Sequence, residues 1–141
     1  AAGVDEEASA PASADPWKGS GIVLVVDDDE TVRILCQRML VRMGFEVILA
    51  RDGREALERF REHVGRIRCV LLDLTMPVMD GEEAFRELRR LDPAVRVLLS
   101  SGYNEQEVIS RFVGKGLAGF VQKPYQYGVL QSALRSALSD R

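Results

Sequence analysis

The sequence predicts an α/β fold in which a doubly wound, five-stranded parallel sheet is flanked by five helices. Short and almost wholly apolar runs alternate five times with longer amphipathic ones between residues 22 and 140. Such apolar runs are typical of strands covered on both faces, and strict strand–helix alternation favours a parallel sheet with right-handed crossovers. Because five strands are too few to close an eight-stranded barrel, we expect an open sheet.

Each expected strand is a short run dominated by Val, Ile and Leu. The run IVLVVD comes first, and FEVILA, RCVLLD, VRVLLS and AGFVQ follow it. Their length of about five residues and their uniform apolarity suit strands buried in a sheet. The expected strands therefore span residues 22–27, 45–50, 68–73, 95–100 and 118–122.

Between the strands, apolar residues recur at spacings of three and four, which predicts amphipathic helices. Gly44 follows the first of these helices and is expected to end it. The helices are expected over residues 29–43, 53–63, 81–91, 104–114 and a final stretch that carries Leu130, Ala133, Leu134, Ala137 and Leu138. The core face of the first helix is expected to carry Val32, Leu35, Cys36, Met39, Leu40 and Met43.

The segment before the first strand has a different composition from the rest of the chain. Residues 1–21 are rich in Ala, Ser, Pro and Gly and show no apolar periodicity, which predicts a flexible linker ahead of a single domain at residues 22–141. The segment lacks the basic start and apolar core of a secretory signal. Trp17 is the exception in this linker, and we expect it to dock on its own domain.

Composition narrows the classes of function. A net charge of −3 argues against direct nucleic-acid binding, which favours a basic patch, and no apolar run is long enough to span a membrane. We therefore expect a soluble domain without membrane contact. Cys36 and Cys69 form no CxxC pair and are expected to be reduced and packed, which favours a cytoplasmic location. His63, the only histidine, is expected to lie at a helix terminus and to have no catalytic role.

Three aspartates carry most of the functional information. Asp27 and Asp28 follow the first strand, and Asp73 closes the third. Because ligands of open parallel sheets bind at the carboxyl ends of the strands, we expect these carboxylates to converge. Crowded like charges favour a bound cation, and hard oxygen ligands suit Mg²⁺. An alternative for part of this group is that Asp28 or Asp29 simply caps the first helix.

Other polar residues are predicted to lie on the same rim. Ser100 and Ser101 end the fourth strand, and Lys123 follows the fifth. An ammonium group and a hydroxyl beside three carboxylates would surround a small anion together with its metal. Asp73 taken alone could instead begin the turn LTMPVMDG, and Lys123 could be a surface charge, but their joint occurrence on one rim favours a phosphate and metal site.

These motifs together resemble the receiver domain of response regulators, the phosphoacceptor module of two-component signalling. The matching segments are VLVVDD, LLDLTMPVMDG, the Ser101–Gly102 step and FVQKP, and the resemblance covers the chain from Ile22 onward. It implies the flavodoxin-like receiver fold. It also implies that the domain is not an enzyme in the usual sense, although it catalyses its own phosphorylation and slow dephosphorylation.

The resemblance also assigns a role to each residue of the site. Asp73 would be the phosphoacceptor, with phosphohistidine on a histidine kinase or a histidine phosphotransfer domain as the donor. Lys123 would be the family's invariant lysine, and its bond to Pro124 would be cis, as is typical there. Ser101 and Phe120 would be the switch residues. The Mg²⁺ ligands would be Asp27, Asp28, Asp73 and the backbone carbonyl of Thr75.

Two further residues are expected to control how long the phosphoryl group persists. Thr75 and Tyr103 each lie two positions beyond a site residue, namely Asp73 and Ser101, and they would flank the approach of a hydrolytic water. We expect Tyr103 in particular to shield the acyl phosphate, because an aromatic ring at this place excludes water.

Two other functions are weighed against this one. The stretch Asp27-Asp28-Asp29-Glu30-Thr31 also fits the DxDxT opening of haloacid dehalogenase-like phosphatases, in which Asp27 would be the nucleophile. That family gives no reason for LLDLTMPVMDG. The other alternative is a receiver that takes no phosphate and serves only for docking. Loss of a site residue would favour this alternative, but the sequence retains all of them.

The linker indicates the context in which the domain works. A Pro/Ala/Ser-rich segment leading into VLVVDD resembles the junction that attaches a C-terminal receiver to a hybrid sensor histidine kinase. A hybrid kinase is therefore the expected parent chain, with a stand-alone regulator as the alternative. Weak homodimer formation stays open.

Overall fold

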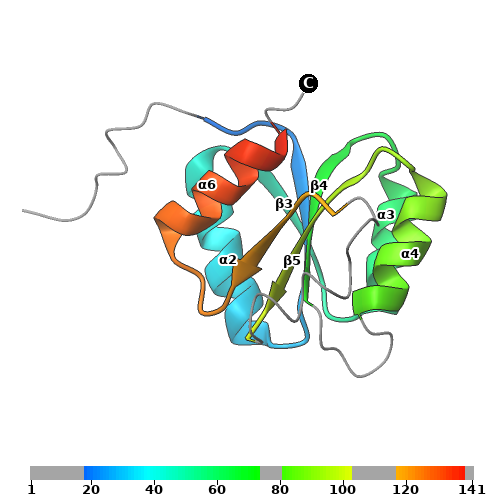
Figure 1. The fold of residues 1–141 in the computed structure, drawn as a ribbon, viewed down its shortest axis with the longest axis horizontal. Coiled ribbons are helices and arrows are strands. Elements are labelled where there is room, and N and C mark those ends of the chain that lie inside the picture. Colours follow the sequence, from blue (N-terminus) through cyan, green and yellow to red (C-terminus); the bar gives the residue numbers. More distant parts are fainter. Residues whose placement is uncertain (1–17, 74–80, 103–116, 139–141) are drawn as a thin grey trace, which may run out of the picture.

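The domain is built on one parallel sheet of five strands. The computed structural model describes residues 18–73, 81–102 and 117–138, apart from the side chain of Ser101. The strand order across the sheet is β3-β2-β4-β5-β6 (Figure 1). These strands are β2 (Ile22–Val26), β3 (Glu46–Ala50), β4 (Ile67–Asp73), β5 (Arg96–Ser101) and β6 (Gly119–Gln122). All four strand pairs are parallel, so the predicted open parallel sheet is confirmed.

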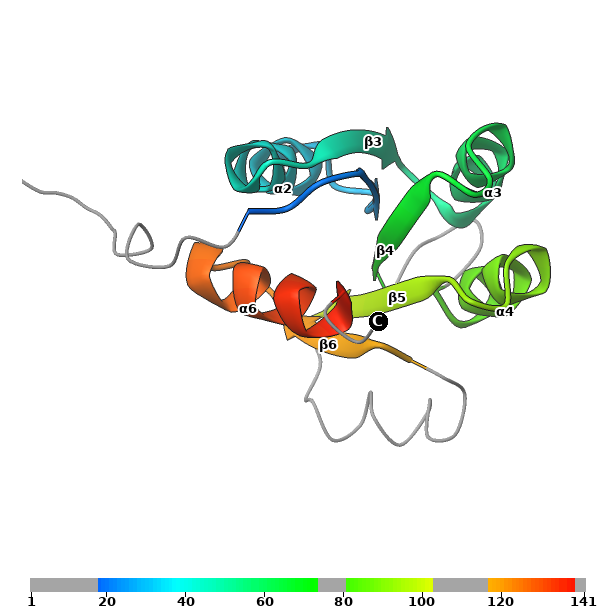
Figure 2. The ribbon, with the colours of Figure 1, turned by 90° about the horizontal axis from the view of Figure 1, so that it is seen from above.

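Helices cover both faces of this sheet. Figure 2 shows α2 and α6 on one side and α3 and α4 on the other, which is the doubly wound arrangement that the sequence predicts. The described helices are α2 (Glu30–Met43), α3 (Gly53–Glu62), α4 (Gly81–Leu91) and α6 (Tyr127–Leu138). The fifth expected helix, at residues 104–114, lies outside the described residues.

Alternation along each strand divides the core into two layers. Val23 and Val25 of β2 pack with α2 and α6, whereas Leu24 and Val26 face α3 and α4. Every residue of β2 is buried, because helices lie over both faces of the sheet. The packing of the central strands on both faces therefore fixes the backbone positions of the polar residues at their carboxyl ends.

The ends of α2 are defined by side-chain and backbone capping. The Asp29 carboxylate accepts hydrogen bonds from the backbone N–H groups of Thr31, at 2.9 Å, and Val32, at 3.3 Å. Gly44 ends the helix with a φ of 110°, a left-handed conformation that glycine adopts without steric penalty. Both observations agree with the expected helix.

The expected core face of α2 is wrong at one position. Cys36, Leu40 and Met43 are buried, but Leu35 is 44% exposed. At about 100° per residue, Leu35 lies about a quarter-turn away from the centre of the buried stripe. Its side chain therefore lies at the margin of the helix face that packs on the sheet, and it is partly exposed to solvent. Apolar spacing alone did not distinguish the middle of the stripe from its margin.

The last residues of the predicted linker contact the domain. The Gly19 N–H donates a hydrogen bond to the Met43 carbonyl at 2.7 Å, and Arg68 donates to the Ser20 carbonyl at 2.9 Å. Residues 1–17, which include Trp17, lie outside the described residues. Among the described helices, none has both the length and the apolarity needed to cross a bilayer.

Both thiols are predicted to be unreactive in the folded protein. Cys36 and Cys69 are free and fully buried, and burial raises the pKa of each thiol to about 12. Since the thiolate is the reactive form, an aromatic disulfide reagent at pH 8 should label neither cysteine in buffer and both in strong denaturant. Fast labelling of the native protein, counted by absorbance, would contradict the burial of the two side chains.

Candidate functional site

The register of the sheet brings the acidic residues to one place. Val26 is the partner of Leu72, so the next residues, Asp27 and Asp73, leave neighbouring strands side by side. Val26 and Leu72 belong to the core layer under α3 and α4, so alternation directs Asp27 and Asp73 to the face under α2 and α6, where they are 0% and 1% exposed. Asp28 is exposed at the mouth of the site. Carboxylate oxygens of these three residues lie within 4.8 Å of one another.

Asp27 is fixed by its own backbone and by the start of α2. Its N–H donates to the Ala50 carbonyl at 3.0 Å, and its Oδ1 accepts from the Asp29 N–H at 2.9 Å. Arg33 donates to the Asp27 carbonyl at 2.6 Å. Because Asp29 caps α2, the Asp28 carboxylate is not required for capping. The alternative that the sequence left open is resolved in favour of Asp29.

Lys123 brings a positive charge to the buried pair of acids. Its Nζ lies 2.7 Å from Asp27 Oδ2 and 3.4 Å from Asp73 Oδ1. Burial by itself lowers the pKa of Lys123, but hydrogen bonds and charge interactions with the two aspartates outweigh it. The pKa therefore rises above its ordinary value of 10.5, and the side chain is an ammonium ion at neutral pH.

The charges at this rim do not balance. Within the described part of the site, three carboxylates face the Lys123 ammonium group, and the Arg33 guanidinium contacts the Asp27 carbonyl, so negative charge is in excess. Asp27 and Asp73 are almost fully buried, so water screens their charges only weakly. A cluster of hard oxygen atoms with excess negative charge is a suitable site for a divalent cation such as Mg²⁺. The donor set therefore fits that ion.

The structure places the other predicted site residues only in part. Thr75, Tyr103 and the side chain of Ser101 lie outside the described residues. The backbone of Ser101 ends β5 and pairs with Gln122. Phe120 lies beside Leu99 on β6 and is partly buried against the core layer of α3 and α4. The peptide bond between Lys123 and Pro124 is cis, as the family resemblance implied.

One polar contact beside the site was missed by the sequence reasoning. The hydroxyl of Tyr125 donates a hydrogen bond to Ser100 Oγ at 2.7 Å, and both side chains are buried. Ser100 was expected on the rim, but it was given no partner. A serine at an inward position of an otherwise apolar strand does signal that a buried partner is needed, because unpaired buried hydroxyls are unfavourable.

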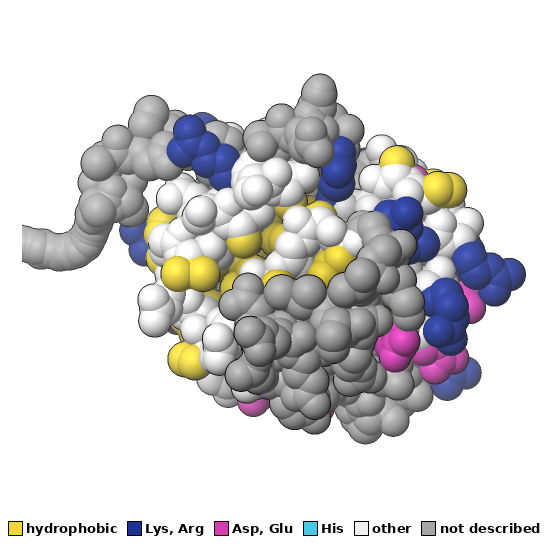
Figure 3. All heavy atoms as spheres, in the orientation of Figure 1, with side chains coloured by type: hydrophobic (Ala, Val, Ile, Leu, Met, Phe, Trp, Pro, Cys, Tyr) yellow, Lys and Arg dark blue, Asp and Glu magenta, His cyan; other side chains and the backbone are white. Residues whose placement is uncertain are grey.

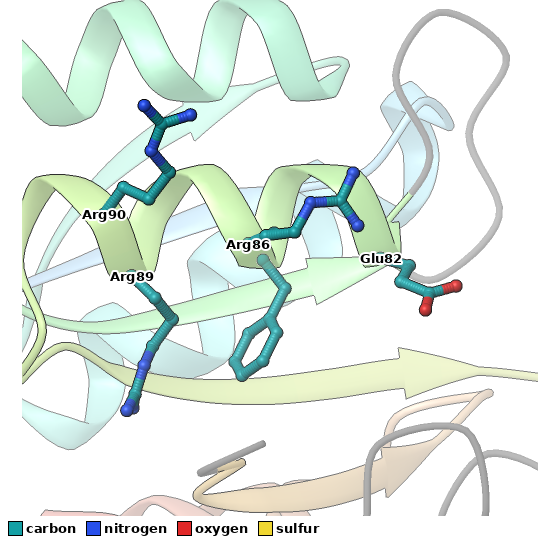
Figure 4. Close-up of a pocket in the computed structure, with 5 residues that line it drawn as sticks. Glu82, Arg86, Arg89 and Arg90 are labelled. Carbon is teal, nitrogen blue, oxygen red and sulfur yellow. The ribbon is translucent and has the colours of Figure 1, made fainter.

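A hollow on α4 is separate from the acidic cluster. Figure 4 shows five residues that line it, and these described residues all come from α4. The Arg89 guanidinium lies 6.0 Å from the ring of Phe85, and Arg90 pairs with Glu87 at 3.2 Å. The described lining residues are Glu82, Phe85, Arg86, Arg89 and Arg90. None of them belongs to the cluster of three aspartates.

His63 lies at the end of α3, as expected. It is the C-terminal cap of that helix, and its Nδ1 lies 3.0 Å from the Arg59 carbonyl. A contact of this kind within the last turn accounts for the ring without a catalytic role.

The known proteins that this chain resembles point to one family. The response regulator receiver domain family matches residues 23–135. Chemotaxis protein CheY of Bacillus subtilis is 32% identical over 118 residues, which cover 83% of this chain and 97% of that protein. Sensor kinase CckA of Brucella abortus is 35% identical over 123 residues, which cover 87% of this chain but only 13% of the kinase.

A solved structure adds a relevant neighbour. The response regulator protein TrrA of Thermotoga maritima, in complex with Mg²⁺ and BeF, superposes with a TM-score of 0.75 at 28% identity. The match covers 84% of this chain and 99% of that one. The similarity therefore extends through the whole domain and is not limited to the acidic motifs.

Replacing Lys123 by methionine is predicted to destabilise the fold. The substitution leaves Asp27 Oδ2 buried without its cation, which should lower the free energy of unfolding by about 1–3 kcal/mol at pH 7. Urea denaturation measures this loss, and Arg51→Met, which removes an exposed partner of Glu55, serves as a matched control that should change little.

The same pair predicts a pH dependence. Because the pKa of Lys123 is raised in the folded state, its contribution to stability is complete below pH 10.5 and is lost as the pH rises through the folded value. The difference in stability between the parent protein and Lys123→Met should therefore narrow at high pH. If the difference in the free energy of unfolding stayed constant above pH 10.5, the predicted ion pair of Lys123 with the two aspartates would be contradicted.

Proposed function

Since the chain belongs to the response regulator receiver domain family of two-component signalling, we propose that it accepts a phosphoryl group on Asp73 in a Mg²⁺-dependent reaction. The observation that carries this proposal is the convergence of Asp27, Asp28 and Asp73 within 4.8 Å, with Lys123 Nζ 3.4 Å from Asp73. A fixed ammonium and a set of acidic metal ligands beside a buried carboxylate are what phosphoryl transfer to that carboxylate requires.

Mg²⁺ would be held by Asp27, Asp28 and Asp73, together with the backbone carbonyl of Thr75. When bound, the ion would neutralise excess negative charge and bind an oxygen of the incoming phosphoryl group. The exposure of Asp28 supports this arrangement, because it leaves one side of the cluster open to the ion and to the donor. The role of Thr75 rests on the family resemblance alone.

The reaction itself requires few groups from the protein. A carboxylate oxygen of Asp73 attacks phosphorus while the bond from phosphorus to the imidazole nitrogen of phosphohistidine breaks, and the histidine leaves. The transition state is loose and its charge is spread over the equatorial oxygens, so positioning and electrostatic stabilisation dominate the catalysis. Lys123 supplies a positive charge whose position is fixed by Asp27, the partner at 2.7 Å.

The phosphorylated state would be recognised through Ser101 and Phe120. A phosphoryl group on Asp73 offers the Ser101 hydroxyl a new hydrogen-bond acceptor, which would draw the end of β5 inward and allow Phe120 to turn. Phe120 also lines a hollow between β6 and α6 with Ala118, Gly128 and Val129, where Figure 3 shows apolar side chains at the surface. Movement of Phe120 would therefore change a surface that a partner could read.

The expected strength of this switch is modest. A hydrogen bond to a charged group contributes roughly 1.5–3 kcal/mol, which shifts a two-state equilibrium by about tenfold to a hundredfold. The domain would thus populate both conformations to a measurable degree, and a partner that binds one of them would complete the change.

The partners follow from the proposed chemistry. The donor would be a histidine kinase or a histidine phosphotransfer domain in the cytoplasm, with no direct role for nucleic acid or membrane. Attachment through the linker at residues 1–21 to a hybrid sensor histidine kinase is supported by the similarity to sensor kinase CckA. Because this chain spans only 13% of that kinase, the activity of a longer parent protein is part of the proposal.

Replacing Asp73 by asparagine is predicted to abolish phosphorylation. In the presence of Mg²⁺, acetyl phosphate should add one phosphoryl group to the parent protein, which intact mass measures as a single increment. Asp73→Asn should show no increment in mass, because an amide is not a competent nucleophile. Asp92→Asn, which alters an aspartate just after α4, is the control and should be labelled like the parent. Labelling that persists in Asp73→Asn, or that maps to Asp27 as in a phosphatase, would contradict the proposal.

Removing the ring of Tyr103 is predicted to shorten the life of the phosphorylated state. If this ring shields the acyl phosphate, Tyr103→Ala should lose phosphate about threefold to tenfold faster than the parent after the donor is removed. Mass spectra taken over time give both rates. An equal rate of loss in the two proteins would count against the shielding role.

A further inference from the structure

Two buried hydroxyl groups lie beside the proposed phosphoacceptor and have no part in the chemistry above. Tyr125 is 7% exposed and Ser100 is 0% exposed, and the Tyr125 hydroxyl donates to Ser100 Oγ at 2.7 Å. The two residues come from different parts of the fold, since Ser100 is in β5 and Tyr125 precedes α6. Their hydrogen bond therefore joins the end of a central strand to the loop after the edge strand.

The pair lies directly beside Asp73. In the parallel ladder Ser100 is the register partner of Asp73. Leu71 and Leu98, two residues earlier on each strand, belong to the same core layer, so Asp73 and Ser100 also point to the same face of the sheet. Burial raises the pKa of the Tyr125 hydroxyl, and the negative charges of Asp27 and Asp73 raise it further, which agrees with a position close to the acidic cluster.

Tyr125 is also close to Lys123 along the chain. Only Pro124 separates them, and β6 ends at Gln122. The short segment that carries Lys123 is thus held on one side by the strand pairing of β6 and on the other by the Tyr125–Ser100 hydrogen bond. Lysine has a long side chain with many rotamers, so a fixed backbone on both sides reduces the freedom of its Nζ.

We propose that Tyr125 is a positioning residue for the phosphoryl transfer, in which its hydrogen bond to Ser100 holds the Lys123 segment so that Nζ stays between Asp27 and Asp73. The inference rests on the proposed function. The distances of 2.7 Å and 3.4 Å from Nζ to the two carboxylates are the geometry that this hydrogen bond maintains. In this role Tyr125 binds neither the metal ion nor the phosphoryl group, and it acts only through Lys123.

A purely structural role is the competing explanation. The ring of Tyr125 packs in the core layer of α2 and α6, and its hydroxyl could merely satisfy Ser100. Tyr125→Phe keeps the ring and removes one oxygen, so it separates the two explanations. Tyr127→Phe is the matched control, because Tyr127 begins α6 two residues away and its ring contacts Arg42 at 4.8 Å.

The first test compares rate with metal affinity. At saturating Mg²⁺ and limiting acetyl phosphate, Tyr125→Phe should be phosphorylated about threefold to tenfold more slowly than the parent, because a small displacement of a charged group weakens transition-state stabilisation. The dissociation constant for Mg²⁺ should stay within twofold, since the aspartates are intact. Tyr127→Phe should match the parent in both. Equal rates for Tyr125→Phe and the parent would overturn the inference.

The second test needs no phosphorylation and so distinguishes this inference from the proposed function. Urea unfolding is measured for the parent, Tyr125→Phe, Lys123→Met and the double variant. If Tyr125 acts through Lys123, the substitution at 125 should change the unfolding equilibrium constant at least about threefold less in the Lys123→Met background than in the parent. Equal changes in the two backgrounds would show that the hydroxyl is only structural and would overturn the inference, whatever the parent's ability to accept phosphate.

Discussion

Three carboxylates are held close together at the carboxyl edge of one sheet, and the repulsion among them governs the chemistry of the site. Asp27 and Asp73 are almost fully buried, and Asp28 completes the cluster at its open side. In such a setting water screens the charges poorly, so nearby groups must offset them. Lys123 does so for the two buried acids, and the remaining negative charge is the physical basis for expecting a divalent cation.

The fold creates this crowding through strand register and alternation. β2 and β4 are adjacent and in register, so residues that follow Val26 and Leu72 emerge together. Alternation then directs Asp27, Asp73 and Ser100 to one face of the sheet. The apolar strands thus do more than form a core, because their packing on both faces prevents the acidic ends from moving apart. The cap at Asp29 adds a further restraint by fixing the start of α2.

Much of this could be predicted from the sequence, because the strands and helices obey simple periodicities and the acids follow strands directly. The observed boundaries differ from the expected ones by about a residue, as helix and strand ends often do. Leu35 was misplaced because spacing does not reveal how wide the buried stripe is. The choice between Asp28 and Asp29 as the cap depended on backbone geometry. The Tyr125–Ser100 hydrogen bond was missed because it joins residues from different elements, although the inward serine hinted at a partner.

Paramagnetic relaxation by Mn²⁺, which takes the same oxygen ligands as Mg²⁺, measures whether the three aspartates bind a divalent cation. Added below one equivalent to isotopically labelled protein, Mn²⁺ should first broaden the amide signals of Asp27, Asp28 and Asp73, with Lys123 next, and excess Mg²⁺ should restore them. Broadening that begins elsewhere, for example at the acidic first turn of α4 around Glu82 and Glu83, would contradict the account. So would broadening that spreads evenly over the acidic surface.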